Sequence, residues 1–403
     1  RGIYSENIDE QVLRYKEAIQ SFMDYYGDQD IMIFSVPGKC EIGGNHTDHQ
    51  QGRVLASAIQ LDSIGIVGKQ DRYVKVIYNE LNINEIDTEN IKYNEAKKGT
   101  MESLINGVLF GLNQKNYHIG GFNAYIQCDI PRNVGLGSSA NFNIMIGTII
   151  NYLYNEGKIE NKYLVQIGRF ATNIFYCKPS GLMNECVCCV GGFIKVDFRN
   201  PNSPDIYKLN TDFSNFDYTL CCVNSNVCRS DNTIDYDAVP KEMIKVANFF
   251  KKDVLRDVSY DEFMKNYRIV RARVGDRPAL RALHFFKEED RVLKQTEVLE
   301  KGDFDTFLKL VRESGDSTFK ALQNIYPQES TRHQNIGTAI VLSENFLGED
   351  GVVKVNGGGF SGTMLAFVKT NRINDYASYV DSIFGKGSCY IIHTREQGAI
   401  RLL

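Results

Sequence analysis

The sequence has no long apolar run and no excess of positive charge. Its 403 residues include 46 Lys and Arg against 50 Asp and Glu, a formal net charge of −4. A nucleic-acid-binding protein usually carries a basic excess or a basic stripe, so this balance argues against that class. No apolar stretch reaches membrane-spanning length, and residues 1–11 are charged rather than apolar. We therefore expect a cytoplasmic protein with no nucleic-acid or membrane partner.

Cysteine is plentiful, with ten residues, but its pattern lacks the spacing of a disulfide framework or a zinc site. Cys128 and Cys221 lie in stretches that predict strands, where reduced cysteine behaves as a small buried hydrophobe. The cluster Cys186, Cys188 and Cys189 has no paired C-x-x-C motif and no nearby histidine. We interpret these cysteines as structural.

The chain is long enough for two or three lobes, and strand patterns alternate with helical ones. A loop with proline and serine, residues 200–205, is the best place for a lobe boundary. The expected helices cover residues 8–26, 101–112, 163–176 and most of 239–347. The expected strands cover residues 31–36, 54–68, 122–130, 193–197, 218–223, 352–355 and 363–368, with a strand pair between 73 and 93.

The most distinctive stretch joins a strand to a helix through glycine and serine. Residues 122–130 alternate between apolar and polar side chains, and residues 142–153 share one apolar helical face. Between them the sequence reads Gly135-Leu136-Gly137-Ser138-Ser139-Ala140. The two serines therefore stand at or just before a helix N-terminus.

A helix N-terminus offers unpaired backbone amides and the positive end of the helix dipole, and glycines let a phosphate approach the backbone. The hydroxyls of Ser138 and Ser139 can bind Mg²⁺ or phosphate oxygens, so the loop is a candidate triphosphate-binding site. The alternative is that one serine only caps the helix. The loop has neither the G-x-x-x-x-G-K-[ST] pattern nor the spacing of a dinucleotide fingerprint.

A second stretch, residues 37–50, concentrates polar residues between two apolar runs and reads PGKCEIGGNHTDHQ. We interpret it as the lining of a pocket for a polar ligand. Two alternatives remain open. The stretch could be a solvated loop capped by Asp48, or His46 and His49 could bind a metal, although the sequence offers no third ligand at a telling distance.

Two further glycine-containing stretches are candidates for a ligand site. Residues 356–362 form a glycine-rich turn between two strands, which suits either a tight hairpin or another close approach of backbone to phosphate. Gly181 comes shortly before Glu185 at the start of a predicted helix. A carboxylate beside a glycine turn could be catalytic, and it could equally be an acid that favours the helix dipole.

The order and spacing of these stretches resemble the GHMP kinases, and within them the galactokinases, over essentially the whole chain. Residues 135–140 resemble the family's nucleotide loop, and residues 357–362 resemble its third, glycine-rich motif. Gly181-Leu182-Met183 resembles the segment before the family's catalytic aspartate, and residues 224–227 with Tyr236 downstream resemble its second sugar-side segment. The galactokinase signature is matched by Gly44, His46, Thr47, Asp48, Gly52 and Val54.

This resemblance implies a two-lobed α/β (α+β) fold that binds a sugar and ATP between its lobes. The N-terminal lobe, residues 1–200, would hold the sugar signature and nucleotide loop on a mixed sheet. The C-terminal lobe, residues 201–403, would hold the third motif on an antiparallel sheet covered by helices. The implied sugar-binding residues are Asn45, His46, Asp48, Gly181 and Tyr236. The implied nucleotide-binding residues are Gly135, Leu136, Gly137, Ser138, Ser139, Ala140, Gly358 and Gly359, with Ser138 and Ser139 also holding Mg²⁺.

Several departures from the family pattern fall in the implied sugar pocket. Asn184 stands where the family has its catalytic aspartate, and Lys39 stands where it has the paired arginine. Asparagine cannot take up a proton near neutral pH, and lysine cannot reproduce the planar fork of arginine. Asn45 replaces the family's glutamate, and Cys228-Arg229 replaces its arginine-histidine pair.

Two hypotheses follow. The first is an ATP-dependent sugar kinase, which would convert galactose to galactose 1-phosphate in galactose catabolism with Asn184 and Lys39 at its catalytic positions. The second is a catalytically impaired relative that binds sugar and ATP as a sensor or regulator. A deliberate base-to-amide replacement at Asn184 is a variant of the second. The sequence fixes neither the sugar, nor the oligomeric state, nor a protein partner.

Overall fold

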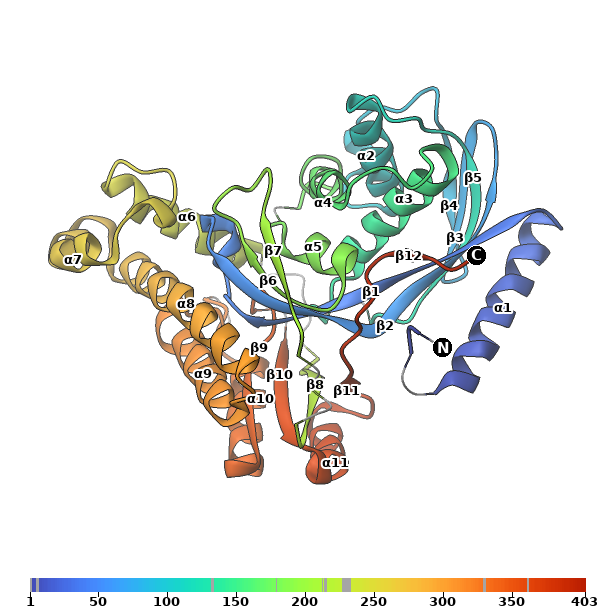
Figure 1. Ribbon diagram of the computed structural model, residues 1–403. Coiled ribbons are helices and arrows are strands. Elements are labelled where there is room, and N and C mark those ends of the chain that lie inside the picture. Colours follow the sequence, from blue (N-terminus) through green and yellow to red (C-terminus); the bar gives the residue numbers. More distant parts are fainter. Residues whose placement is uncertain are drawn as a thin grey trace.

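Two β-sheets organise the chain, with helices packed around them (Figure 1). The computed structural model describes residues 2–4, 7–131, 134–178, 180–211, 213, 216–226, 233–328, 331–360 and 362–403. Among the described residues, no helix has the length and apolar character needed to cross a membrane.

The first sheet is built on a long antiparallel hairpin. Its strands follow the order β12-β1-β2-β5-β3-β4, and β6 and β7 extend it from the other end of β2. The pair β3 and β5 is parallel and the other pairs are antiparallel, so the sheet is mixed. The strands are β1 (Ile31–Gly43), β2 (Arg53–Lys69), β3 (Tyr73–Tyr78), β4 (Leu81–Asp87), β5 (Phe122–Cys128), β6 (Phe193–Asp197), β7 (Asp205–Leu209) and β12 (Ile400–Arg401).

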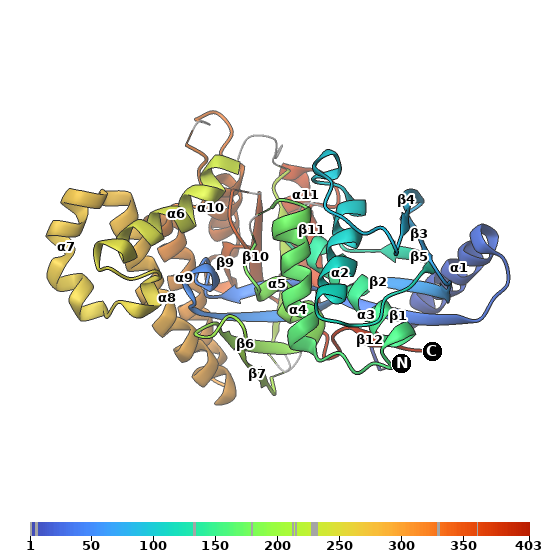
Figure 2. The same ribbon diagram turned by 90° about the horizontal axis from the view of Figure 1, so that it is seen from above.

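Helices cover both faces of this sheet because its central strands bury side chains on both sides. Ile64 and Ile66 of β2 pack with Phe22 of α1. The intervening Gly65 faces α3, where an added methyl group would lie 3.2 Å from the sulfur of Met145. Figures 1 and 2 show the helices α2 to α5 gathered on the face opposite α1. The helices are α1 (Ile8–Tyr26), α2 (Met101–Gln114), α3 (Ser138–Tyr154), α4 (Asn161–Phe170) and α5 (Met183–Val190).

The second sheet has the order β11-β8-β10-β9 and is antiparallel throughout. Its cluster of buried side chains joins Val353 and Met364 with Ile340 of α10 and Val380 of α11. The strands are β8 (Tyr218–Asn224), β9 (Gly351–Val355), β10 (Thr363–Lys369) and β11 (Cys389–Ile392). The helices beside them are α9 (Phe304–Ser317), α10 (Asn335–Leu347) and α11 (Ile373–Phe384).

Three helices form a separate cluster at one end of the molecule: α6 (Thr233–Phe249), α7 (Tyr260–Val274) and α8 (Asp276–Glu300). They share a core that includes Met243, Phe263 and Phe285. Both views place α7 and α1 at opposite ends of the molecule (Figures 1 and 2).

Most of the predicted elements are confirmed, but two of them have different bounds in the structure. The strand predicted over 31–36 continues to Gly43, because Pro37 to Gly43 pair with β2 across two register shifts. The helix predicted over 163–176 ends at Phe170 and continues as a π-helical turn, Ala171–Phe175. The lobe division at residue 200 remains a prediction, and β7 and β12 of the first sheet both lie beyond it.

A buried carboxylate ties both ends of the described chain to the first sheet. Asp62 of β2 is fully buried and forms ion pairs with Arg14 of α1 at 2.7 Å and with Arg395 at 2.8 Å. Tyr4 and Ser35 also donate hydrogen bonds to it. Burial alone would raise the pKa of Asp62, but the two arginines hold that pKa below its usual value.

We expect Asp62→Asn to destabilise the fold by about 3–5 kcal/mol, because it leaves buried arginine charge uncompensated. Arg395 would lose its only anionic partner among the described residues, and Arg14 would keep only Asp129. Urea unfolding measures the change. The matched control is Asp87→Asn, which removes the exposed pair with Arg72 and should barely change stability. Equal losses in both variants would contradict this account.

Candidate active site

The turn after β1 carries the polar residues of the second stretch. Gly44 has φ of +82°, and a methyl group there would lie 2.3 Å from the carbonyl oxygen of Arg53, so the turn packs tightly against the start of β2. His46 has φ of +59°, a left-handed conformation that is uncommon for a residue with a side chain. A short 3₁₀ helix, Asp48–Gln50, follows. This backbone fixes where the side chains of Asn45, His46 and Asp48 point.

Asn45 holds this turn against distant parts of the chain. Its amide nitrogen donates to Glu41 and to the carbonyl oxygen of Gly357, and its amide oxygen accepts from Asn324 at 2.8 Å. Its backbone carbonyl accepts a hydrogen bond of 2.9 Å from His284 of α8. Every polar group of the Asn45 side chain is therefore used to join the turn to the third motif and to the helices.

His46 points toward the third motif and toward α6. Its Nε2 donates to the carbonyl oxygen of Gly358 at 2.9 Å, and its Nδ1 lies 3.2 Å from Nε2 of His49. The ring of Tyr236 lies 6.4 Å from the His46 ring, and a methyl group on Gly358 would lie 2.1 Å from the Tyr236 ring. His46, Tyr236 and Gly358 therefore pack together on one side of the candidate site.

Asp48 lies against Gly181, the glycine before α5. A methyl group on Gly181 would lie 1.7 Å from Oδ2 of Asp48, so a larger residue there would displace the Asp48 carboxylate. The amide of His49 donates to Oδ1 of Asp48 at 2.8 Å. Burial and the nearby Glu41 raise the pKa of Asp48, while His46 and Arg169 oppose the rise. Asp48, in the turn after β1, and Gly181, just before α5, meet here.

The glycine-serine loop opens α3 without a side-chain cap. Gly137 is the N-cap residue, with φ of +86°, and no side chain accepts a hydrogen bond there. Ser138 and Ser139 are the first two helical residues, so neither occupies the capping position that the sequence left open. Neither hydroxyl bonds to another described residue, and both residues are partly exposed. The N-terminus of α3 thus keeps its donors and hydroxyls available.

Lys39 connects the nucleotide loop with the third motif. Its backbone amide donates to the carbonyl oxygen of Leu136, and its side chain runs past Gly137, where an added methyl group would lie 2.8 Å from Cγ. Its amine ends near Gly357, 3.9 Å from where a methyl group would sit. The side chain is 3 % exposed, yet the amine has no ion pair with a described residue. An anionic ligand bound here would stabilise this buried, unpaired charge.

The third motif approaches the same place from the second sheet. Gly359 has φ of +72°, and a methyl group on it would lie 2.1 Å from the carbonyl oxygen of Asn324. That carbonyl accepts a hydrogen bond from the amide of Phe360. Asn324 therefore binds both the third motif and Asn45, and it holds the two motifs in register.

Asn184 and Glu185 occupy the first turn of α5. Oδ1 of Asn184 and Oε2 of Glu185 are both buried without a hydrogen-bond partner in the described structure. Burial raises the pKa of Glu185 to about 8, opposed by Arg169 and Lys39. The helix dipole alone does not account for a carboxyl group held neutral at neutral pH.

The donors around the α3 N-terminus fit a triphosphate with Mg²⁺. Backbone amides, two hydroxyls and the Lys39 amine supply positive or hydrogen-bonding groups, and glycines leave room for the phosphates. The described residues include no cluster of three or more His, Cys, Asp or Glu side chains that could hold a metal. Mg²⁺ usually takes few protein ligands and relies on substrate phosphates and water.

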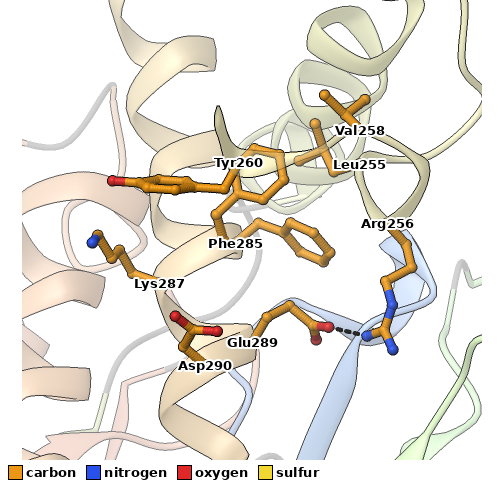
Figure 3. A pocket seen from close by; sticks show the side chains of 9 residues that line it. Leu255, Arg256, Val258, Tyr260, Phe285, Lys287, Glu289 and Asp290 are labelled. Carbon is orange, nitrogen blue, oxygen red and sulfur yellow. Dashed lines mark hydrogen bonds and ion pairs between the residues drawn. The ribbon is translucent and has the colours of Figure 1, made fainter. Parts of the chain in front are cut away.

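A surface cavity of about 160 Å³ lies away from these motifs, between α8 and the segment before α7. Figure 3 shows Arg256 pointing toward Glu289, with which it forms an ion pair, beside Phe285 and Tyr260. None of the predicted site residues lines this cavity. The candidate active site, at the meeting point of the motifs, is therefore distinct from this cavity.

The structure thus brings together the residues that the sequence singled out in three separate stretches. Contacts link Gly137 to Lys39, Lys39 to Gly357, Asn45 and His46 to the third motif, and Asp48 to Gly181. Val227, Cys228, Arg229 and Ser361 lie outside the described residues. Asn324, His284 and Arg169 also contact residues of the site, and no short motif in the sequence marks them.

Two family descriptions and several known proteins are similar to this chain in sequence. The galactokinase galactose-binding signature matches residues 20–69, and the N-terminal domain of GHMP kinases matches residues 103–192. The galactokinase of Streptococcus suis (strain 05ZYH33) is 26% identical over 377 residues, 91% of this chain and 92% of the relative. The galactokinase of Clostridium tetani (strain Massachusetts / E88) is 25% identical over 380 residues, 93% of both chains.

Solved structures share the fold. Lactococcus lactis galactokinase, complexed with galactose, aligns with a TM-score of 0.83 and 20% identity, covering 96% of this chain and all of that one. Methanococcus jannaschii mevalonate kinase aligns with a TM-score of 0.62 and 17% identity, covering 91% and 98%. The two family matches show that the chain carries the galactose-binding signature of galactokinases and the N-terminal domain of GHMP kinases, and the structural alignments show that it has the fold of these kinases. Over most of its length the chain is similar to galactokinases.

We expect Asn45→Asp to destabilise the protein by about 1–3 kcal/mol, because it loses two donated hydrogen bonds and adds a carboxylate beside Glu41. The loss should be larger at pH 8 than at pH 5, since neighbouring carboxylates raise one another's pKa and protonation relieves the repulsion. Thermal unfolding across pH measures it. Adding Glu41→Gln should recover part of the loss, and strictly additive effects would contradict the proposed contact.

Proposed function

We propose that the protein transfers the γ-phosphoryl group of ATP to the anomeric hydroxyl of a hexose, and that this hexose is galactose. The observation that carries the proposal is the path of Lys39, whose side chain runs past Gly137 of the nucleotide loop and ends near Gly357 of the third motif, the glycine to which Asn45 of the sugar-side turn donates a hydrogen bond. A phosphoryl group passing between the two halves of the site would meet this charge. The identity of the relatives supports the choice of sugar.

Phosphoryl transfer needs positioning and electrostatic stabilisation more than covalent chemistry. In this proposal the α3 N-terminus and Ser138 and Ser139 hold the phosphates and Mg²⁺, and Lys39 stabilises charge on the transferring group. Mg²⁺, when bound, would neutralise phosphate charge. Asp48 would accept hydrogen bonds from two neighbouring ring hydroxyls, and Tyr236 and His46 would line the ring.

A second candidate is a protein that binds sugar and ATP but turns over slowly or not at all, acting as a sensor. Asn184 favours it, because an amide at this position cannot take up the proton of the sugar hydroxyl. A general base usually contributes about 10²–10⁴-fold to rate, so its absence slows a kinase without preventing transfer.

One experiment separates the two. The purified protein is incubated with Mg²⁺-ATP and either galactose, N-acetylgalactosamine, glucose or mannose, and the sugar 1-phosphate is measured. Formation of galactose 1-phosphate well above a no-enzyme control supports the kinase. Binding of galactose and ATP by calorimetry with no product supports the sensor, and binding of neither would overturn both.

We expect Asn184→Asp to raise turnover by about tenfold or more near neutral pH, because it restores a carboxylate to the start of α5. Initial rates of sugar 1-phosphate formation measure the change. Affinity for the sugar should stay within a small factor. No gain in rate would show that a base at this position does not limit the reaction.

We expect Ser139→Ala to weaken Mg²⁺-ATP binding about tenfold, because it removes a hydroxyl from the proposed phosphate site. Calorimetry with a non-hydrolysable ATP analogue measures the affinity. Ser382→Ala, which removes an exposed hydroxyl on α11 bonded to its own helix, is the matched control. Unchanged affinity in Ser139→Ala would count against the assigned phosphate site.

A further inference from the structure

His49 is a histidine in the turn after β1 that the assignments above leave without a role. It lies in the short 3₁₀ helix Asp48–Gln50, and its neighbour Gln50 is fully buried. Both ring nitrogens of His49 have a partner: Nε2 lies 3.2 Å from Nδ1 of His46, and Nδ1 lies 3.3 Å from Nε2 of Gln50. His46 in turn places its Nε2 2.9 Å from the carbonyl oxygen of Gly358. These side chains therefore form a continuous series of hydrogen bonds that ends on the third motif.

The other end of this series is the backbone amide of Leu255, which donates to Oε1 of Gln50 at 3.0 Å. Leu255 begins the short 3₁₀ helix Leu255–Asp257 and is buried in the core that α6, α7 and α8 share. The hydrogen bonds therefore connect the three-helix cluster with the third motif, through the turn that carries His46.

The two ends fix the direction of every hydrogen bond between them. A backbone amide only donates, so the Gln50 side chain turns its oxygen toward Leu255 and its NH₂ group toward His49. Nδ1 of His49 must then accept, which leaves the ring proton on Nε2 to be donated to Nδ1 of His46. His46 therefore carries its own proton on Nε2, where the carbonyl oxygen of Gly358 accepts it. The directions assigned from either end agree.

This arrangement requires both rings to be neutral. A proton added to Nδ1 of His46 would face the N–H group of His49, and a proton added to Nδ1 of His49 would face the NH₂ group of Gln50. Burial and the nearby rings of His46 and His284 lower the pKa of His49 well below its usual value. A neutral His49 is therefore consistent with its surroundings.

The hydrogen bonds also fix how the His46 ring faces a ligand. Both of its nitrogens are bonded to the protein, and its ring centre lies 6.4 Å from that of Tyr236. The backbone of His46 has the uncommon φ of +59°, which the two side-chain bonds help to maintain. A ligand on this side of the site would meet the carbon atoms of the ring rather than a free nitrogen.

We propose that His49 is a positioning residue that holds His46 as the neutral tautomer with its proton on Nε2, and so keeps the His46 ring bonded to Gly358. The effect on the sugar rests on the proposed function, in which His46 lines the hexose ring. His49 acts through His46 rather than through the ligand. Without the N–H group of His49, the His46 ring is no longer restricted to one tautomer and one orientation.

Nuclear magnetic resonance of protein labelled with ¹⁵N in its histidine rings tests the tautomers directly, because protonated and unprotonated ring nitrogens differ strongly in chemical shift. The chain has six histidines, and single substitutions of His46 and His49 assign their signals. We expect both residues of the ligand-free wild-type protein to carry their proton on Nε2. A proton on Nδ1 of either ring, or a rapidly exchanging mixture of tautomers, would overturn the proposal.

Two substitutions of His49 separate the donor from the volume of the ring. His49→Phe keeps an aromatic ring without the donor, and His49→Gln supplies an amide NH₂ group in place of the Nε2–H group. We expect His46 to lose its single tautomer in His49→Phe and to keep it in His49→Gln. Galactose affinity by calorimetry should fall about three- to tenfold in His49→Phe, as for one lost hydrogen bond, and stay within about twofold of wild type in His49→Gln. Equal effects of the two substitutions would overturn the role of the donor.

Gln50→Glu tests the direction of the bonds while keeping the shape of the side chain, and it decides the question if His49→Phe does not fold. A carboxylate oxygen accepts where the amide NH₂ group donated, so the proton of His49 should move to Nδ1. The spectrum is recorded at about pH 8, well above the usual pKa of a carboxyl group. An unchanged His49 tautomer in this variant would contradict the proposal.

The tautomer measurements need neither ligand nor turnover, so they separate this inference from the function on which its effect on the sugar rests. A wild-type protein that binds no galactose but carries both protons on Nε2 would overturn the proposed sugar binding and support the positioning of His46 by His49. Galactose binding by a protein with the other tautomers would overturn only the role of His49.

Discussion

The hydrogen bonds of one buried amide hold the proposed site together. Asn45 donates to Glu41 and Gly357 and accepts from Asn324, while its carbonyl accepts from His284. These partners belong to β1, the third motif, the segment after α9 and the helix α8. A side chain that could only accept hydrogen bonds would leave two of these acceptors facing another acceptor. The glycine contacts of the third motif depend on this arrangement, because Asn324 also fixes Gly359.

The balance of charge in the site follows from the same residues. Lys39 has a buried stem and an amine that no described acid neutralises, while Asn184 brings no negative charge to face it. Asn45 and Asn184 stand where the family pattern has acids. Each has another carboxyl group beside it: Glu41 bonds to Asn45, and Glu185 follows Asn184 in the sequence. Since burial disfavours a charged carboxyl group, Glu185 stays mostly neutral near pH 7. The site therefore favours anionic ligands at neutral pH more than the sequence motifs alone indicate.

The sequence predicted the elements whose structure follows from a local pattern of side chains. It did not predict the elements that depend on contacts between distant parts of the chain. The period-two strand and apolar helix around residues 135–140 predicted β5 and α3 because both bury one regular face. The last strands, β11 and β12, have only four and two residues, and pairing with distant β8 and β1 rather than local propensity makes them strands. Motif residues could be named in advance, but Asn324 carries no signal in the sequence because its contact with Asn45 joins residues 279 positions apart.

For Glu185, the sequence and the structure lead to different expectations about the charge of its side chain. In the sequence it is an acid in the first turn of a helix, where the dipole favours a negative charge. In the structure it is buried against Gly168, and desolvation opposes that charge more strongly than the dipole supports it. Burial at this position therefore raises the pKa of Glu185 to about 8, well above the pKa of an exposed glutamate.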